Sequence, residues 1–204
     1  MPKIRPFDTR DLDSLYAISL ATGLTGADAS MLYKDPKMIG HIYSAPYALL
    51  EPDLTLIIED EEGVAGFVVG AVDTYSWESK LELEWWPLLR RQYIDPSDKE
   101  ADSWTSDQRR SYMIHHPTRT PFYVTEQYPA HLHLNLLPRL QKKGFGTMLF
   151  EIWLTIAKNH GAEAVHVGVN RDNTRAIHFW KKQAFKELMP DDLQEGRTLW
   201  LGRR

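Results

Sequence analysis

The stretch YPAHLHLNLLPRLQKKGFGTMLFEIW, residues 128–153, carries the clearest structural pattern in this chain. Its first part alternates histidine with leucine, which predicts a β-strand that ends at Pro138. After two glycines, the second part has apolar residues at helical spacing. A strand that passes through a glycine turn into a helix leaves unpaired backbone N–H groups at the helix N-terminus, and these groups favour an anion.

The turn itself, residues 141–147, has the features of a phosphate-binding loop. Gly144 and Gly146 lack a Cβ, so a phosphate oxygen can approach the backbone closely. Gln141, Lys142 and Lys143 add polar or cationic side chains around that position. The spacing Gln-x-x-Gly-x-Gly lacks the Gly-Lys-Ser/Thr ending of nucleoside-triphosphate loops. The same glycines are also compatible with a plain turn before a helix, and the loop alone does not separate the two interpretations.

The rest of the chain predicts a mixed sheet with helices on its faces. Residues 73–127 hold four of the seven tryptophans and regain β alternation only at FYVTEQ, so we interpret them as a helical, aromatic-rich insertion between core strands. We therefore predict a single α/β (α+β) domain, residues 1–204, with a mixed central sheet. The predicted elements are strands at 4–7, 54–60, 64–72, 128–136, 163–169 and 198–201, and helices at 12–20, about 30–43, after the glycine turn, and 174–183.

Composition narrows the possible functions. The 204 residues include 24 basic and 28 acidic side chains, and this net charge of -4 disfavours a nucleic-acid binder. There is no cysteine, which excludes a disulfide framework, a thiolate metal site and a cysteine nucleophile. We find no signal peptide and no apolar run of membrane-spanning length, so we expect a cytoplasmic protein that does not bind membranes. The sequence leaves open whether the protein is a monomer or a homodimer.

Two motifs in the C-terminal half resemble the GNAT acetyltransferase superfamily. Its members carry Pro-x-x-[Arg/Gln]-x-x-Gly-x-[Gly/Ala] between a strand and a helix, followed after another strand by Asn-x-x-Ala-x-x-Phe-Tyr-x-x-x-Gly-Phe. The matching residues here are Pro138, Gln141, Gly144, Gly146, Asn173, Ala176, Phe179, Trp180, Ala184 and Phe185. The resemblance implies a GNAT fold, with acetyl-CoA as cofactor and its pyrophosphate in the glycine turn. It also implies that a bulge splays the sheet at the cofactor site, so that the pantetheine arm pairs with freed backbone groups.

The residues that the resemblance assigns to acetyl-CoA lie in the strand end, the glycine turn and the second motif. They are Leu136, Leu137, Gln141, Lys142, Lys143, Gly144, Phe145, Gly146, Thr147, Asn173, Ala176, Phe179 and Trp180. Most members have tyrosine at the position of Trp180, where its hydroxyl protonates the departing sulfur. An indole N–H is not a general acid under these conditions. This substitution leaves the proton donor to another group or to water, or it removes catalysis.

A second resemblance runs almost end to end. The stretches IRPF, GHIYSAPY, LIIEDEEGVAGFVVGAVDT, LEWWPLLRRQY and FWKKQAFKEL are similar to the acetyltransferase-like C-terminal region of eukaryotic O-GlcNAc hydrolases and to its free-standing bacterial relatives. The eukaryotic region is thought to have lost the glycine loop, whereas this chain keeps it. Retention of the loop favours a protein that binds the cofactor.

The catalytic candidates lie on the strand before the loop. His131 and His133 are two residues apart, so both point to the same face of the strand, and one of them is the expected general base. The pattern resembles the strand histidines that relay a proton in arylalkylamine N-acetyltransferases. The alternative is that both are structural histidines bonded to nearby carbonyls. The backbone N–H of Leu136 or Leu137 is the donor that the resemblance implies for the thioester carbonyl. A zinc site would need a third ligand at motif spacing, so we predict no metal.

The acceptor pocket is expected from the insertion and from GHIYSAPY. The predicted lining residues are Tyr43, Tyr47, Trp85, Trp86 and Tyr112, although packing of the insertion on the sheet is an alternative role for each aromatic residue. We predict an N-acetyltransferase that acts on a small primary amine. Two alternatives remain: a non-catalytic acyl-CoA-binding or interaction module, suggested by Trp180, and a protein lysine acetyltransferase, which would need an open acidic groove.

Overall fold

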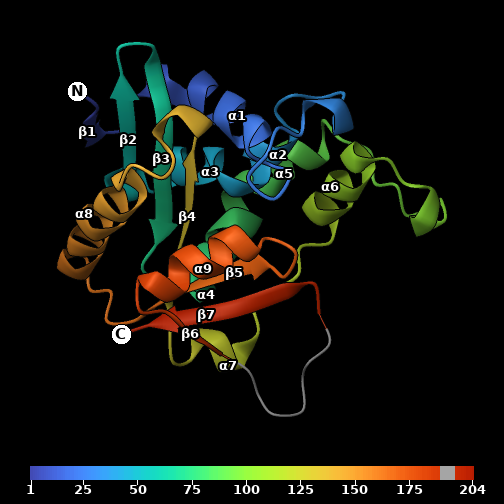
Figure 1. The fold of residues 1–204 in the computed structure, drawn as a ribbon. Helices are drawn as coiled ribbons and strands as arrows, with labels where there is room; N and C mark the ends of the chain where they lie inside the picture. The colour runs from blue at the N-terminus through green and yellow to red at the C-terminus, as the bar shows by residue number, and fades with distance from the viewer. Residues whose placement is uncertain (189–195) are drawn as a thin grey trace.

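The computed structural model describes residues 1–188 and 196–204, and within them one mixed sheet has the strand order β1-β2-β3-β4-β5-β7-β6 (Figure 1). Neighbouring strands are antiparallel, except that β4 and β5 are parallel. The strands are β1 Lys3–Pro6, β2 Thr55–Asp60, β3 Gly63–Ala71, β4 Ala130–Leu136, β5 Val165–Asn170, β6 Lys186–Glu187 and β7 Thr198–Arg203. The predicted strands are confirmed, and the two-residue β6 is an addition to them.

Helices cover both faces of this sheet, as predicted. They are α1 Leu12–Ala21, α2 Met38–Tyr43, α3 Ala45–Leu50, α4 Thr74–Lys80, α5 Trp86–Arg90, α6 Ser106–His115, α7 Phe122–Thr125, α8 Phe145–Asn159 and α9 Thr174–Lys182. One core joins α8 and α9 to the sheet through Phe150, Trp153 and Trp180. A second core, around Phe67 and Trp77, joins the opposite face to the helices between α1 and α6. None of the described helices is long and apolar enough to cross a membrane.

The N-terminal segment follows the sequence pattern. Asp8 and Asp11 form a capping box around the 3-10 turn Thr9–Asp11, which leads directly into α1. Arg5 on β1 binds the Asp11 carboxylate and also Glu59 on β2, and so ties the edge strand to this turn. These contacts explain why the predicted strand-then-helix order holds.

The helix predicted over residues 30–43 is shorter than expected. The chain forms a 3-10 turn at Ser30–Leu32, becomes extended at Tyr33, and starts α2 only at Met38. The Asp107 carboxylate on α6 accepts the N–H groups of Lys34 and Asp35 at 3.0 Å each. Because these N–H groups bond to a side chain rather than to preceding carbonyls, helix does not extend through this segment.

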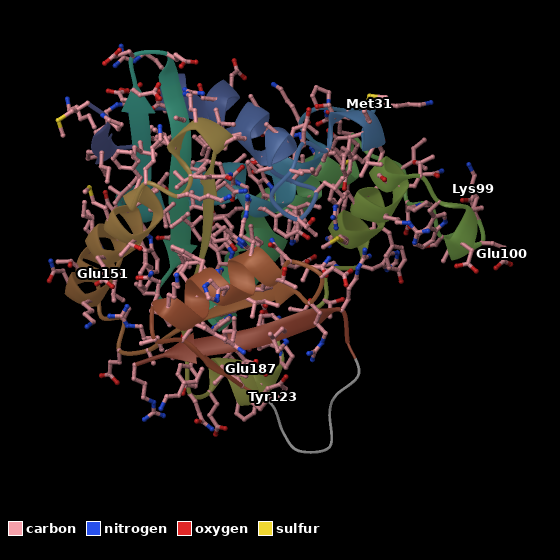
Figure 2. All side chains as sticks on the ribbon, in the orientation of Figure 1. Met31, Lys99, Glu100, Tyr123, Glu151 and Glu187 are labelled. Carbon is pink, nitrogen blue, oxygen red and sulfur yellow. The ribbon has the colours of Figure 1, made fainter. Side chains whose placement is uncertain are left out.

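Residues 73–127 lie between the paired strands β3 and β4 and are helical, as the interpretation as an insertion requires. α4 continues through a π-helical turn at Leu81–Trp85 into α5. The expected strand character of FYVTEQ is wrong, since residues 122–125 form α7. Lys99 and Glu100 lie at the outer tip of the segment between α5 and α6, far from the sheet (Figure 2).

The sheet splits between β4 and β5. These strands pair only at Ala130 with Val165 and at His131 with His166, after which they diverge. In Figure 1, β2 and β3 stand upright whereas β7 crosses below them. The expected bulge is absent from β4 over residues 131–136, because its register with β3 is regular from Ala71–His131 to Gly66–Leu136. The splay therefore arises from early loss of parallel pairing and not from a bulge against β3.

Candidate active site

The glycine loop, residues 141–147, places a row of free N–H groups at the start of α8. Gly144 is the N-terminal flanking residue of α8 and has φ of 85°, and Lys142 is also left-handed with φ of 59°. Among the described residues, no backbone or side-chain acceptor takes the N–H groups of Lys142 to Thr147. The loop residues are half-buried or exposed, so these N–H groups are accessible. This arrangement suits an anion with several oxygens.

Each glycine of the loop has a separate physical reason. At Gly144 the left-handed backbone disfavours any side chain, and a Cβ would point into open space. At Gly146 a Cβ would lie 3.3 Å from the ring of Phe179 on α9 and 3.5 Å from Leu136. Gly146 therefore permits α9 to pack closely against the first turn of α8.

Two side chains hold the loop in place. Gln141 donates its amide to the carbonyl of Leu136 at 2.6 Å, which anchors the loop to the end of β4. Arg175, on the first turn of α9, donates to the Gln141 amide oxygen at 2.9 Å and to the carbonyl of Gly26 at 3.3 Å. Sequence patterns did not identify Arg175, whose guanidinium becomes a neighbour of the loop only through the fold. It adds a cation beside the predicted anion site.

The end of β4 decides which backbone group can donate into the split. The N–H of Leu137 bonds to the carbonyl of Ala65 on β3 at 2.8 Å, so it is occupied. Backbone groups alternate between the two edges of a strand, so the N–H of Leu136 points away from β3, toward the side where β5 has diverged. The prediction of the Leu137 N–H as a donor to the thioester is therefore wrong. The N–H of Leu136 remains the predicted donor.

The second motif builds α9 and its packing. The side chain of Asn173 caps α9 by accepting the N–H of Ala176 at 3.1 Å. Trp180 is buried against Phe150 and Phe185, with ring centroids 5.4 and 5.0 Å apart. Trp180 thus fills the core beneath α8 and α9, where an indole gives packing and no general acid.

On β4, the polar face carries His131, His133 and Asn135, while Leu132 and Leu136 enter the core under α8. The hydroxyl of Thr74 donates to the carbonyl of Pro129 at 2.6 Å, which uses its only hydrogen. Its 2.7 Å contact with Nδ1 of His131 is therefore a bond in which the imidazole donates. A neutral His131 must then accept at Nε2.

The donor and acceptor roles at His131 also fix those at His133, because the hydroxyl of Tyr47 bonds to both rings. The Tyr47 hydroxyl lies 2.8 Å from Nε2 of His131 and 3.2 Å from Nε2 of His133. Because it donates to His131, it accepts from the N–H of His133. The neutral tautomer of His133 therefore carries its proton on Nε2, and no described group takes Nδ1. The Nδ1 lone pair of His133 is the atom that can accept a proton.

Burial keeps these histidines neutral. It is the largest cause that lowers the pKa of His133 to about 4, with a smaller effect from His166. Burial also lowers the pKa of His131 well below its usual value and that of His166 to about 4. His166 lies under His131, with ring centroids 5.6 Å apart, and donates from Nδ1 to the carbonyl of Tyr128 at 2.6 Å. The three histidines are thus neutral at physiological pH, and His131 and His133 are linked through the hydroxyl of Tyr47.

The lowered pKa values predict acid sensitivity. Since the folded protein resists protonation of these histidines, the unfolded chain binds more protons between about pH 4 and 6.5, and stability falls as pH decreases through that window. Each such histidine contributes up to about 1.4 kcal/mol per pH unit. We expect the urea midpoint to drop steeply below pH 6.5 and His166→Asn to reduce the slope. The exposed His178→Asn is the control, and an unchanged midpoint between pH 7 and 4.5 would contradict the assignment.

A cleft of about 1660 Å³ lies over the polar face of β4, between the insertion and the β5–β7 part of the sheet. Of the predicted site residues, Tyr43, Tyr47, Trp86, Tyr112, His131, His133 and Asn173 line it. Trp85 does not, because it packs away from the cleft and donates its indole N–H to the carbonyl of His41 at 2.8 Å. The prediction for Trp85 is therefore wrong. Among the described residues no group of three or more His, Asp or Glu side chains is placed to hold a metal ion.

The split between β4 and β5 lies beside a row of free N–H groups at the start of α8. This arrangement fits an extended anionic ligand that lies against a sheet edge. The sequence profile of the acetyltransferase (GNAT) family matches residues 27–185. The chain therefore belongs to the GNAT acetyltransferase family, and this membership supports an acyltransferase with an acyl-CoA cofactor.

Relatives of known structure agree with the fold. The protein called SsHAT is 31% identical, with 99% of this chain and 97% of that chain covered and a TM-score of 0.89. The putative acetyltransferase yncA from Salmonella typhimurium, solved with acetyl-CoA, has a TM-score of 0.56 at 14% identity, covering 100% of this chain and 94% of that chain. Protein O-GlcNAcase from Rattus norvegicus is 22% identical over 188 residues, which are 91% of this chain. The chain spans only about one fifth (20%) of that relative's length.

Proposed function

We propose that this protein is an acetyl-CoA-dependent N-acetyltransferase that transfers an acetyl group to the primary amine of a small molecule. The observation that carries the proposal is the row of free N–H groups from Lys142 to Thr147 beside the open edge of β4. Family membership supplies the reaction class. The whole chain, residues 1–204, would act as one domain, as a monomer or a homodimer.

The glycine loop would hold the pyrophosphate of acetyl-CoA. Its amides supply donors without the cost of moving side chains, and Lys143 and Arg175 lie on its borders as cations. Beyond His131, β4 has no pairing with β5, so backbone groups on that edge have no strand partner among the described residues. The amides of the pantetheine arm would bond to these groups in the way that an additional β-strand would. Phe179 would lie beneath this arm next to Gly146.

The transfer needs an aligned carbonyl and a route for one proton. Acetyl-CoA supplies the acetyl group as a thioester, whose carbonyl carbon the amine nitrogen attacks as the C–S bond breaks. The N–H of Leu136 would donate to the carbonyl oxygen, where negative charge develops. Nδ1 of His133 would accept the proton that the amine loses, while Tyr47 and His131 fix its tautomer. With Trp180 buried in the core, water would protonate the departing thiolate.

The cleft favours a small acceptor over a lysine-bearing protein tail. A protein lysine acetyltransferase was expected to show an acidic groove. Here the insertion side of the cleft carries three arginines, Arg109, Arg110 and Arg119, and two glutamates. Of the glutamates, Glu82 is paired with Arg90 and Glu78 accepts the N–H of Thr120. Cationic walls repel a lysine-rich tail.

The test combines a binding and a turnover measurement. We expect saturating acetyl-CoA to raise the melting temperature substantially, because a ligand at 100 times its Kd stabilises by about 2.7 kcal/mol. We also expect CoA release with members of a library of small amines, amino sugars and lysine peptides, and faster release with small amines. No thermal shift at saturating acetyl-CoA would contradict the cofactor assignment.

Trp180 and the similarity to O-GlcNAcase favour one alternative, a non-catalytic acyl-CoA-binding or interaction module. The two proposals share the thermal shift and differ in turnover. Binding of acetyl-CoA with no CoA release for any acceptor would support the module and reject the enzyme.

A further inference from the structure

The cleft contains a half-buried cation, Arg110, whose partners are all uncharged. On α6, its Nε donates to the Tyr33 hydroxyl at 3.1 Å, and its Nη1 lies 3.3 Å from the Tyr43 hydroxyl and 3.1 Å from the sulfur of Met113. Within residues 1–188 and 196–204, no carboxylate lies within 4.0 Å of it. A half-buried guanidinium without a counter-ion is costly unless a ligand supplies the charge.

The carboxylates near this part of the cleft have other partners. Asp107, one turn earlier on α6, accepts the N–H groups of Lys34 and Asp35, and Asp35 itself accepts the hydroxyl of Tyr93 at 2.7 Å. Glu82 binds Arg90, and Glu78 accepts the N–H of Thr120 at 2.7 Å. These contacts leave Arg110 without a negative partner from its surroundings.

The groups around Arg110 can complete an anion site. Nη2 has no acceptor among the described residues. The Tyr33 hydroxyl accepts from Arg110, so its own hydrogen is available, and the Tyr43 hydroxyl has only a weak 4.0 Å contact to the sulfur of Met113. One guanidinium nitrogen and two phenol hydroxyls therefore offer three donors to an anion.

Arg110 lies close to the predicted general base, with the ring of Tyr43 between them. Its guanidinium lies over the ring of Tyr43, 5.5 Å from the ring centroid, and the same ring is 5.5 Å from that of His133. All three residues line the same cleft. Arg110 is therefore separated from the predicted base His133 by a single aromatic ring.

We propose that Arg110, with Tyr33 and Tyr43, binds an anionic group of the acceptor, so that the substrate is a small amine that also carries a carboxylate or a phosphate. This inference rests on the proposed function for its amine and adds the second group. The amine would lie at Nδ1 of His133 and the anion on the far side of Tyr43. Such a substrate would contact both His133 and Arg110.

The first experiment compares matched acceptors in the CoA-release assay. The pairs are phenylalanine with 2-phenylethylamine, lysine with cadaverine, and 2-aminoethyl phosphate with ethanolamine. We expect kcat/KM for the member with the anionic group to exceed that of its partner without one by about 10- to 100-fold, the range for a charge-assisted hydrogen-bonded contact. The first two pairs report on a carboxylate and the third on a phosphate. Equal values in all three pairs, or preference for the members without the anionic group, would overturn the proposal.

Arg110→Gln should remove this preference, mostly through KM, while acetyl-CoA still raises the melting temperature. Arg91→Gln is the matched control, because Arg91 is exposed and is not one of the residues that line the cleft. If Arg110→Gln fails to fold, the double variant Tyr33→Phe, Tyr43→Phe removes two of the donors and should weaken the preference. Retention of the full preference in the folded variant would contradict the assignment.

A binding measurement separates this inference from the proposed function. The Nε–H resonance of Arg110, followed in the protein without acetyl-CoA, should shift in a saturable manner with acetate or with inorganic phosphate, whichever anion the site takes. A saturable shift without any turnover would support the anion site while rejecting the transferase. If neither anion moves the resonance while amines without an anionic group are turned over, the anion site is rejected and the proposed transferase activity stands.

Discussion

Gly144→Val should abolish measurable binding of acetyl-CoA while the protein stays folded. Valine at φ of 85° is strained, so the backbone of the loop would have to change and the N–H groups that it carries would lose their common direction. Each hydrogen bond from such an amide to a charged oxygen is worth about 1.5–3 kcal/mol, so losing two weakens binding about a hundredfold or more. Isothermal titration calorimetry with acetyl-CoA measures the loss directly.

The chain offers a matched control at the other end of α8. Gly161 also has a left-handed backbone, with φ of 94°, and a Cβ there likewise meets nothing within 4 Å. Gly161→Val should therefore cost similar stability, about 1–2 kcal/mol, and leave the affinity for acetyl-CoA unchanged. Equal loss of affinity in both variants would mean that the effect is on folding and would remove the loop from the site.

His133→Ala should lower kcat for acetyl transfer by about 10²-fold, the lower end of the usual contribution of a positioned general base, because burial lowers the pKa of His133 to about 4 and weakens it as a proton acceptor. Acetyl-CoA should still bind, since His133 enters the cleft from the middle of β4, whereas the glycine loop begins only after the end of that strand. The measurement is single-turnover CoA release together with calorimetry. Wild-type kcat in the folded variant would show that the amine loses its proton to water or to another group.

Tyr47→Phe gives a finer test of the same base. It keeps the ring that stacks on Trp77 at 4.2 Å but removes the hydroxyl between the two histidines. We expect a smaller loss of kcat than for His133→Ala. We also expect the ¹⁵N spectrum of the His133 imidazole to change, because the proton is no longer held on Nε2 and both neutral tautomers become populated. An unchanged tautomer would contradict the direction derived from Thr74.

Much of the fold follows from local patterns in the sequence. The alternation in β4 correctly separates His131 and His133 from Leu132 and Leu136, because strand side chains alternate strictly between faces. The glycine turn before α8 is likewise encoded within a few residues. Its residues are close in sequence, so the pattern alone predicts it.

The remaining features depend on contacts between distant segments. The early start expected for α2 fails because Asp107, more than 70 residues away, takes the N–H groups of Lys34 and Asp35. Leu137 is excluded as a donor by its partner Ala65, and Trp85 turns toward His41. The roles of Thr74 and Arg175 also emerge only once their strands and helices meet. The spacing of residues along the sequence does not predict contacts between such distant segments.

An amide NMR titration of the wild-type protein with CoA and, separately, with pantetheine, which lacks the phosphates, tests whether the glycine loop holds the pyrophosphate. We expect the N–H resonances of Lys142 to Thr147 to shift most strongly with CoA, since they would bond to its pyrophosphate, and to stay in place with pantetheine. If these resonances remain unmoved at saturating CoA, the loop does not hold the pyrophosphate and the proposed cofactor site is wrong.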